Sequence, residues 1–241
     1  MNYAIILAAG VGQRMRNGGM PKQFVKVMGK PIVALTLEKF EDNEEIDKII
    51  IVCHGNYVEH MQDVLRQYPI SKVTNIVVGG SNRQASLIKG LETIRDLGGS
   101  DDDIVVIHDG VRPLVNQNTI YENIRMAKET GCAITVHPVT ETVVITDTTE
   151  AGMDDFQKRS ATYSMTSPQS FRLGNVLKAY EDNTGDSDIP LLDAAMVYAS
   201  QGGKASLVKE QGINIKITTP EDYYVLKALL ELEENKYVFG L

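Results

Sequence analysis

The chain has 241 residues, with 24 Lys and Arg against 32 Asp and Glu, so its formal net charge is −8. Apolar residues make up 43% and charged residues 23%, a composition typical of globular proteins with a full core, which excludes a mainly disordered chain. The acidic balance argues against nucleic acid as a partner, because proteins that bind it generally present a basic face to the phosphates. An anionic ligand would therefore need a local cluster of basic residues.

Targeting signals and disulfides are not expected. The longest apolar runs, such as residues 3–9, fall far below the roughly 18 residues of a membrane-spanning helix, so we expect no membrane partner. The N-terminus has neither the basic stretch nor the small-residue cleavage site of a signal peptide, which predicts a cytoplasmic protein. Cys53 and Cys132 lie far apart at the ends of apolar runs, and this placement favours buried free thiols.

Short runs rich in Ile and Val alternate with stretches of helical length along most of the chain. This alternation predicts the α/β class, with a Rossmann-like, mostly parallel sheet and helices on both faces. The expected strands are 3–7, 48–53, 73–78, 103–108, 132–138, 205–209 and 213–217. The expected helices are 31–41, 57–68, 82–97, 119–130, 173–181, 192–201 and 220–237.

The segment 139–164 departs from this alternation. Residues 141–149 are β-branched and partly alternating, whereas 148–155 have the polar composition of turns. We therefore predict an excursion from the sheet, a protruding β-arm. Because no internal repeat, low-complexity tract or linker separates the chain, we expect one domain, 1–241, that carries this arm.

A glycine-rich loop follows the first expected strand, reading Leu-Ala-Ala-Gly-Val-Gly-Gln-Arg-Met over residues 7–15. Gly10 and Gly12 permit a close backbone approach, so that N–H groups can face phosphate oxygens. Arg14 and Lys22 add positive charge. The loop lacks the third glycine of a dinucleotide fingerprint, since Met15 stands there, and Gly-Lys-Pro at 29–31 is not the end of a P-loop. A glycine-rich turn with solvated basic residues remains the alternative.

Five separated motifs, taken in order, resemble the cytidylyltransferases of sugar-alcohol phosphates. This family includes the methylerythritol 4-phosphate enzyme of isoprenoid biosynthesis and the ribitol 5-phosphate enzyme of cell wall biogenesis. The resemblance covers essentially the whole chain and implies a nucleotidyltransferase with a GT-A-like fold. The motifs are the glycine-rich loop with the following Pro-Lys-Gln, then Gly79–Ser86, His108–Pro113, Ser167–Phe171 and Asn214–Thr218.

The resemblance implies a site that binds CTP with Mg²⁺ as cofactor. It assigns catalytic contacts with the phosphates to Arg14, Lys22 and Lys216, and the metal to Asp109. No covalent nucleophile is required, because an acceptor phosphate oxygen attacks the α-phosphorus directly. The residues that it places on the nucleotide are Leu7, Ala8, Ala9, Gly10, Gly12, Gly80, Ser81, Arg83 and Ser86.

The acceptor, a sugar-alcohol phosphate, is expected at a second group of residues. Two of them belong to the arm of a neighbouring subunit in the family, so the resemblance implies a homodimer that forms through residues 139–164. The residues implied for the acceptor are Asp109, Arg112, Thr142, Arg159 and Ser167.

Departures from the methylerythritol phosphate branch bear on the choice of acceptor. That branch typically reads His-Asp-Ala-Ala-Arg-Pro, whereas this chain has Val111 in His-Asp-Gly-Val-Arg-Pro. The interval from Arg14 to Lys22 is also one residue longer and resembles the ribitol phosphate branch. We therefore favour D-ribitol 5-phosphate, converted to CDP-ribitol, with 2-C-methyl-D-erythritol 4-phosphate as the alternative.

Two functions of other classes are alternatives. A nicotinamide-dependent oxidoreductase on a similar sheet is disfavoured by Met15. A non-catalytic nucleotide-binding protein is disfavoured because Arg14, Lys22 and Asp109 occur together with Lys216.

Overall fold

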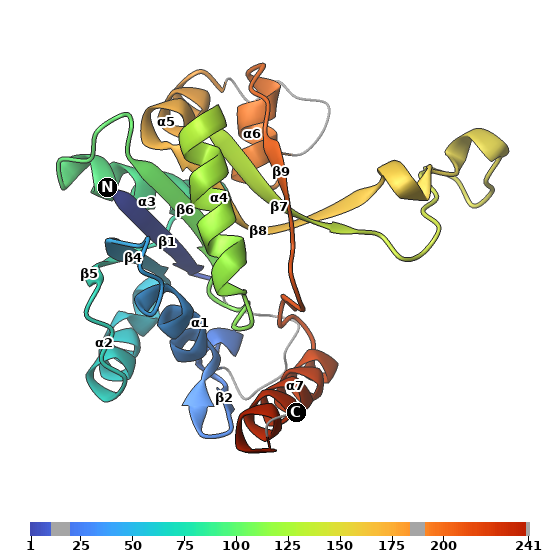
Figure 1. Ribbon diagram of the computed structural model, residues 1–241. Coiled ribbons are helices and arrows are strands. Elements are labelled where there is room, and N and C mark those ends of the chain that lie inside the picture. The colour runs from blue at the N-terminus through green and yellow to red at the C-terminus, as the bar shows by residue number, and fades with distance from the viewer. Residues whose placement is uncertain (11–19, 184–190, 240–241) are drawn as a thin grey trace.

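The computed structural model describes residues 1–10, 20–183 and 191–239, and its centre is a twisted sheet (Figure 1). Within these residues the sheet has seven strands in the order β5-β4-β1-β6-β8-β7-β9. β8 runs antiparallel to β6 and β7, and the other neighbouring strands pair in parallel. The strands are β1 (Asn2–Ala8), β4 (Lys48–Cys53), β5 (Val73–Val78), β6 (Ile104–Asp109), β7 (Cys132–Pro138), β8 (Tyr163–Arg172) and β9 (Ser206–Lys209).

Helices cover both faces of this sheet, which confirms the predicted α/β class. The small ribbon β2 (Lys26–Val27) and β3 (Lys30–Pro31) precedes the first helix. The α-helices of the described residues are α1 (Ile32–Glu41), α2 (Val58–Gln67), α3 (Arg83–Asp96), α4 (Gln117–Thr130), α5 (Leu173–Glu181), α6 (Ala194–Ser200) and α7 (Pro220–Phe239). None of these helices has the length and apolar character needed to cross a membrane.

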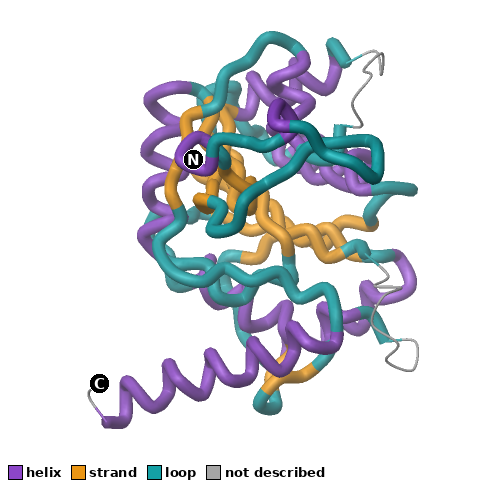
Figure 2. Tube along the Cα trace, turned by 90° about the vertical axis from the view of Figure 1, so that its right-hand side faces the viewer, coloured by secondary structure: helices purple, strands orange, loops and turns teal. Residues whose placement is uncertain are grey.

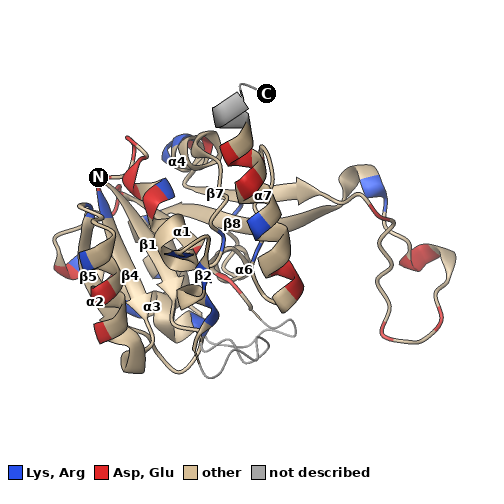
Figure 3. Ribbon diagram, turned by 90° about the horizontal axis from the view of Figure 1, so that it is seen from below, with Lys and Arg blue, Asp and Glu red and all other residues tan. Residues whose placement is uncertain are grey.

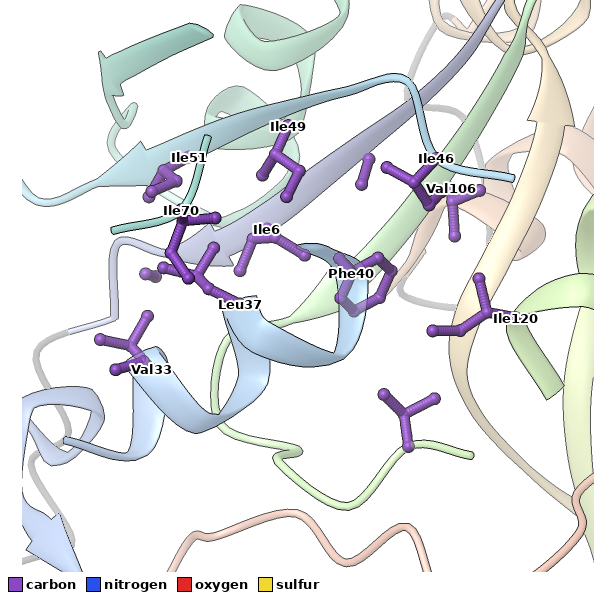
Figure 4. Close-up of a cluster of buried hydrophobic side chains, with 14 of the residues drawn as sticks. Ile6, Val33, Leu37, Phe40, Ile46, Ile49, Ile51, Ile70, Val106 and Ile120 are labelled. Atoms are coloured by element: carbon purple, nitrogen blue, oxygen red, sulfur yellow. The ribbon is translucent and has the colours of Figure 1, made fainter. Parts of the chain in front are cut away.

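The core is divided by the sheet into two layers. Alternate residues of β1 point to opposite faces, as the period of a strand requires. Ile6 faces α1, α2 and α4, whereas Ile5 faces α3, α5 and α6. Figure 4 shows Ile6 beside Leu37 and Phe40 of α1. Each such large side chain removed from water contributes roughly 1.5–3 kcal/mol, so both layers hold β1 in place.

The carboxyl ends of β1, β4, β5 and β6 therefore lie at one edge of the sheet, because these four strands are parallel neighbours. Loops from segments far apart in the sequence meet at this edge. In open α/β sheets this is where ligands bind.

The predicted arm is present and protrudes from the sheet between β7 and β8 (Figures 1 and 2). Its base continues the pairing of these strands, with Pro138 opposite Tyr163. Beyond that pair, the described arm contains one isolated bridge, between Val144 and Phe156, and two short 3-10 turns. The arm is thus mostly irregular.

Two strand predictions differ from the structure. β8 was not expected from the sequence, although it lies in the middle of the sheet. The segment 213–217 was expected to be a strand but forms none. Instead, Ile217 N–H donates a backbone hydrogen bond to the carbonyl of Val111 at 2.9 Å. Ile217 is buried with Leu226 of α7, so the end of this segment packs against that helix.

Candidate active site

A cleft of about 510 Å³ opens at the carboxyl ends of β1, β4, β5 and β6. The described residues that line it come from six separate segments of the chain. They are Leu7, Ala8, Ala9, Gly10, Lys22, Gln23, His54, Gly80, Ser81, Asn82, Arg83, Ser86, Asp109, Val111 and Lys216.

Most residues predicted for the nucleotide lie in this cleft. Leu7 to Gly10, Lys22, the glycine-rich turn before α3, Asp109 and Lys216 all contribute to its wall. Arg112 borders it through contact with Asp109. Gly12 and Arg14 lie outside the described residues, so their predicted roles stay predictions.

Three predicted acceptor residues do not line the cleft of their own chain. Thr142 and Arg159 are exposed on the arm, which extends away from the sheet (Figure 1). Ser167 is 2% exposed and lies behind the Asp109 loop.

The turn after β5 is shaped by close backbone approach. A Cβ on Gly79 would lie 2.6 Å from the Cβ of Ala9, and one on Gly80 would lie 2.5 Å from the Cβ of Ala85. Only glycine fits at such distances. Asn82 caps α3 by accepting a hydrogen bond from Ala85 N–H, and the Ser86 hydroxyl oxygen accepts one from Gly80 N–H at 3.0 Å. The helix N-terminus is thereby held at the cleft, where its positive end favours anions.

Asp109 is the carboxylate around which the basic residues gather. Its Oδ2 lies 3.0 Å from Lys216 Nζ and 3.2 Å from Arg112 Nε, and its Oδ1 lies 3.4 Å from Arg83 Nη2. Burial alone would raise the pKa of this carboxyl, but its three basic neighbours outweigh burial and hold the pKa well below its usual range. Asp109 is therefore ionised, and the surplus charge around it is positive.

A buried hydrogen-bond network supports the Asp109 loop from below. His108 Nε2 donates to the carbonyl of Arg112 at 3.1 Å, so Nδ1 accepts from the Ser167 hydroxyl at 3.0 Å. The Ser167 oxygen in turn accepts from Asp109 N–H at 3.2 Å. Burial lowers the pKa of His108 to about 4, which keeps its ring neutral near pH 7 and fixes this direction of donation.

The same network extends to the segment that carries Lys216. Asn214 Nδ2 donates to the backbone carbonyl of Ser167 at 2.6 Å, and the Asn214 carbonyl accepts from Arg112 Nη1 at 2.8 Å. Loops after β6 and before α7 are thereby linked through β8. Arg112 is thus positioned by a hydrogen bond to a backbone carbonyl as well as by its ion pair with Asp109.

The donor set suits a divalent cation that is bound mainly by substrate. Among the described residues, no group of three or more His, Cys, Asp and Glu could form a protein-only metal site. Asp109 is ionised and lines the cleft. Mg²⁺ is commonly bound by one or two carboxylates together with substrate phosphates, and Asp109 fits that pattern.

Sequence reasoning assigned no role to four residues that line the cleft. Gln23 belongs to the Pro-Lys-Gln motif, so its place in a motif was the available signal. Asn82 is recognisable as a helix cap. Val111 lies within the motif His108–Pro113, which was its available signal. His54 carries no local signal of a cleft, because it reaches the cleft only since β4 ends at the same sheet edge.

Comparisons with known proteins agree over nearly the whole chain. Residues 2–232 match the family described as IspD, 2-C-methyl-D-erythritol 4-phosphate cytidylyltransferase. A protein from Streptococcus agalactiae serotype III named ribitol-5-phosphate cytidylyltransferase is 37% identical over 241 residues, covering 100% of both chains. A protein of the same name from Vibrio parahaemolyticus is 38% identical over 240 residues, again covering 100% of both chains.

The fold also matches a solved structure. The chain superimposes on 4-diphosphocytidyl-2C-methyl-D-erythritol synthase from Anaerococcus prevotii with a TM-score of 0.81 and 28% identity, covering 95% of this chain and 96% of the other. This likeness confirms the predicted nucleotidyltransferase architecture.

Proposed function

Because the chain belongs to the IspD family of cytidylyltransferases, we propose that it transfers CMP from CTP to D-ribitol 5-phosphate and releases pyrophosphate. A phosphate oxygen of the acceptor attacks the α-phosphorus of CTP and forms the new P–O bond. The bond between the α-phosphorus and the bridging oxygen breaks, and pyrophosphate leaves with that electron pair. The products are CDP-ribitol and pyrophosphate.

One observation carries this proposal: Lys216, Arg83 and Arg112 converge on Asp109 beside the carboxyl ends of parallel strands. Transfer of a nucleotidyl group needs little covalent chemistry from the protein, since positioning and stabilisation of charge provide most of the rate. Lys22 and Lys216 are suited to the negative charge that builds up on the phosphates, and both line the cleft. Arg14 is proposed to add a third cation.

Asp109 is proposed to hold the divalent cation, with Mg²⁺ as the expected ion. When bound, that ion neutralises charge on the triphosphate. The chain's own residues bind and orient the rest of the nucleotide. The turn at Gly80 and Ser81 is proposed to hold the base, because both residues line the cleft just before the N-terminus of α3.

Two lines of support favour ribitol phosphate over methylerythritol phosphate. Relatives named ribitol-5-phosphate cytidylyltransferase are 37–38% identical over the full length. Val111, which departs from the methylerythritol branch, lines the cleft, so this difference lies where it can contact substrate. The methylerythritol reaction remains the alternative, because the family description carries that name.

The arm is proposed to form a homodimer and to supply Thr142 and Arg159 to the partner's acceptor site. Both residues are exposed on the arm and away from their own cleft. Large apolar side chains near the tip are also exposed, including Ile145 at 64% and Met153 at 84%. Burial of these side chains between subunits would favour association. We also propose that the enzyme acts in the cytoplasm.

An omission assay tests the proposed reaction. The protein is supplied with CTP, Mg²⁺ and D-ribitol 5-phosphate, and pyrophosphate release is measured with each component left out in turn. Rapid release only when all three are present is expected, and Arg112→Ala should slow it. Absence of release with any sugar-alcohol phosphate would contradict the proposal.

A further inference from the structure

Gln23 is a buried polar residue in the wall of the cleft to which neither the motif nor the reaction assigns a role. It is 1% exposed, and it lies on a short 3-10 turn, Lys22–Phe24, directly after Lys22. A buried carboxamide is costly unless it is hydrogen-bonded, so its partners indicate its role.

Both partners of the Gln23 amide group belong to the glycine-rich loop. Nε2 donates to the carbonyl of Ala8 at 2.7 Å and to the carbonyl of Gly10 at 3.0 Å. An NH₂ group has two hydrogens, so these two bonds use its full donor capacity. The orientation of the amide is also determined, because a carboxamide oxygen could not face two carbonyl oxygens.

These bonds matter because the cleft is built for a polyanion. A carbonyl oxygen carries partial negative charge and would repel a triphosphate. Within one planar trans peptide, the C=O and N–H point in opposite directions. Holding the Ala8 carbonyl at Gln23 therefore turns the Ala9 N–H away from Gln23, and Ala9 itself lines the cleft.

The turn that carries Gln23 is anchored on its other side. Phe24 is 4% exposed and packs edge-on against the ring of His60, with centroids 4.6 Å apart. Its N–H donates to the carbonyl of Pro21 at 3.0 Å. Lys22 thus sits between a proline and two anchored residues, and Gln23 connects the backbone of this lysine to the start of the glycine-rich loop.

We propose that Gln23 is a positioning residue for the triphosphate of CTP: it orients the carbonyls of Ala8 and Gly10 and fixes Lys22 relative to them. The inference rests on the proposed use of CTP in this cleft. It assigns to Gln23 no contact with the reacting atoms.

The test compares Gln23→Glu with Gln23→Met. Glu has nearly the same shape, but its carboxylate cannot donate a hydrogen bond and adds negative charge, whereas Met fills the volume without a donor. Each variant should lower kcat/KM for CTP by about ten- to a hundredfold, the size of loss that a displacement of about 1 Å produces. The KM for the acceptor should stay within about twofold of the wild-type value. Gln201→Glu, an exposed change of the same chemistry, is the matched control.

A pH profile separates positioning from general stability. Burial against two carbonyls should raise the pKa of a glutamate at position 23, and its protonated form can again donate to the Ala8 carbonyl. The activity of Gln23→Glu relative to wild type should therefore rise several-fold between about pH 8.5 and about pH 6, while Gln23→Met shows no such recovery. The inference is overturned if the activity of Gln23→Glu relative to wild type does not change with pH, or if Gln23→Met keeps the wild-type kcat/KM for CTP. It is also overturned if the KM for the acceptor rises as much as the KM for CTP.

Calorimetric binding of CTP distinguishes this inference from the proposed reaction. If the wild type binds CTP but releases no pyrophosphate with any acceptor, the proposed reaction is wrong. The role of Gln23 is then decided by the Kd for CTP. This Kd should be higher in both variants than in wild type, and at low pH it should fall toward the wild-type value only in Gln23→Glu. Equal Kd values in wild type and variants would overturn it.

Discussion

Asp109 has three cationic neighbours, more positive charge than one carboxylate can neutralise. In the absence of substrate this carboxylate keeps Arg83, Arg112 and Lys216 close together despite their mutual repulsion. A phosphate entering the cleft meets cations that are already positioned, so little reorganisation is needed during the reaction. If Asp109 binds the proposed metal ion, the metal would replace one of these ion pairs.

Lys22 should affect the chemical step more than binding. We expect Lys22→Ala to lower kcat by roughly 10²–10³-fold, while the Kd for CTP rises by less, because the charge of this lysine is needed most in the transition state. Rapid-quench kinetics and calorimetry measure the two effects separately. Lys26→Ala removes an exposed lysine four positions away and should change neither. Equal losses in kcat and CTP affinity would contradict this role.

His108 should make stability depend on pH in a defined window. Its folded-state pKa of about 4 lies below the unfolded value of 6.5, so the unfolded chain binds more protons between these two values. The free energy of unfolding should therefore fall as the pH drops from about 6.5 to about 4, with His108 contributing at most about 1.4 kcal/mol per pH unit.

Urea unfolding in metal-free buffer measures this dependence. His108→Gln keeps an N–H near the Arg112 carbonyl but cannot titrate, so its stability should fall less steeply over the same pH range. Identical slopes in the two proteins would show that His108 is not held neutral by burial.

Most residues that line the cleft were predictable from local sequence, whereas the contacts that support them were not. Lys22, Asp109 and Lys216 stand in motifs and lie in the cleft as expected. The support given by Ser167 to Asp109 joins residues 58 positions apart, and no local pattern specifies such a bond. Ser167 was predicted to bind the acceptor. The structure shows that it is buried behind the loop, where its hydroxyl oxygen accepts the hydrogen bond from Asp109 N–H.

At the scale of elements, β8 illustrates why one central strand escaped prediction. Its sequence is polar, and Pro168 stands in its middle, which argues against a central strand. The structure accommodates both features. The register between β7 and β8 shifts near the proline, and Gln169 accepts a hydrogen bond from Ala195 N–H at 3.2 Å. The partners of β8 in these contacts, β7 and Ala195, are distant in the sequence, so the hydrophobic pattern of β8 itself could not predict them.

The segment 213–217 shows the opposite error, because a strand was predicted there and none forms. Its alternation of Ile with polar residues is the pattern of a half-buried strand. Ile217 is buried against α7 as this pattern predicts, but Ile213 is 57% exposed. The segment joins no strand of the sheet. The alternation of apolar and polar residues indicates which side chains are buried. Whether the segment pairs as a strand depends on a sheet edge being free beside it.

The arm predicts that two inactive variants can complement each other in mixed dimers. If Arg159 acts in the partner's site, Arg112→Ala and Arg159→Ala should each lose acceptor use, and co-expression should restore about a quarter of wild-type activity, since half the dimers are mixed and each then has one intact site. Pyrophosphate release from the co-purified mixture measures the recovery.

Lys158→Ala, a change at the neighbouring exposed residue, should leave activity close to wild type. No recovery in mixtures that contain proven mixed dimers would place Arg159 outside the shared site.

At the scale of the whole molecule, the charge of −8 is distributed unevenly. Acidic residues are distributed along the outer helices and the arm (Figure 3). The basic residues of the cleft lie beside one buried carboxylate at the edge of the sheet. The molecule as a whole repels polyanions such as nucleic acid, whereas the cleft attracts a small triphosphate at short range, where salt screens less.

A competition assay between the two acceptors measures the proposed preference for ribitol phosphate. Wild-type protein receives limiting CTP with D-ribitol 5-phosphate and 2-C-methyl-D-erythritol 4-phosphate at equal concentrations, and mass spectrometry quantifies the two CDP products. We expect CDP-ribitol to exceed CDP-methylerythritol by about tenfold or more, which corresponds to roughly 1.4 kcal/mol of difference between the two transition states. A majority of CDP-methylerythritol, or no CDP product at all, would contradict the proposed function.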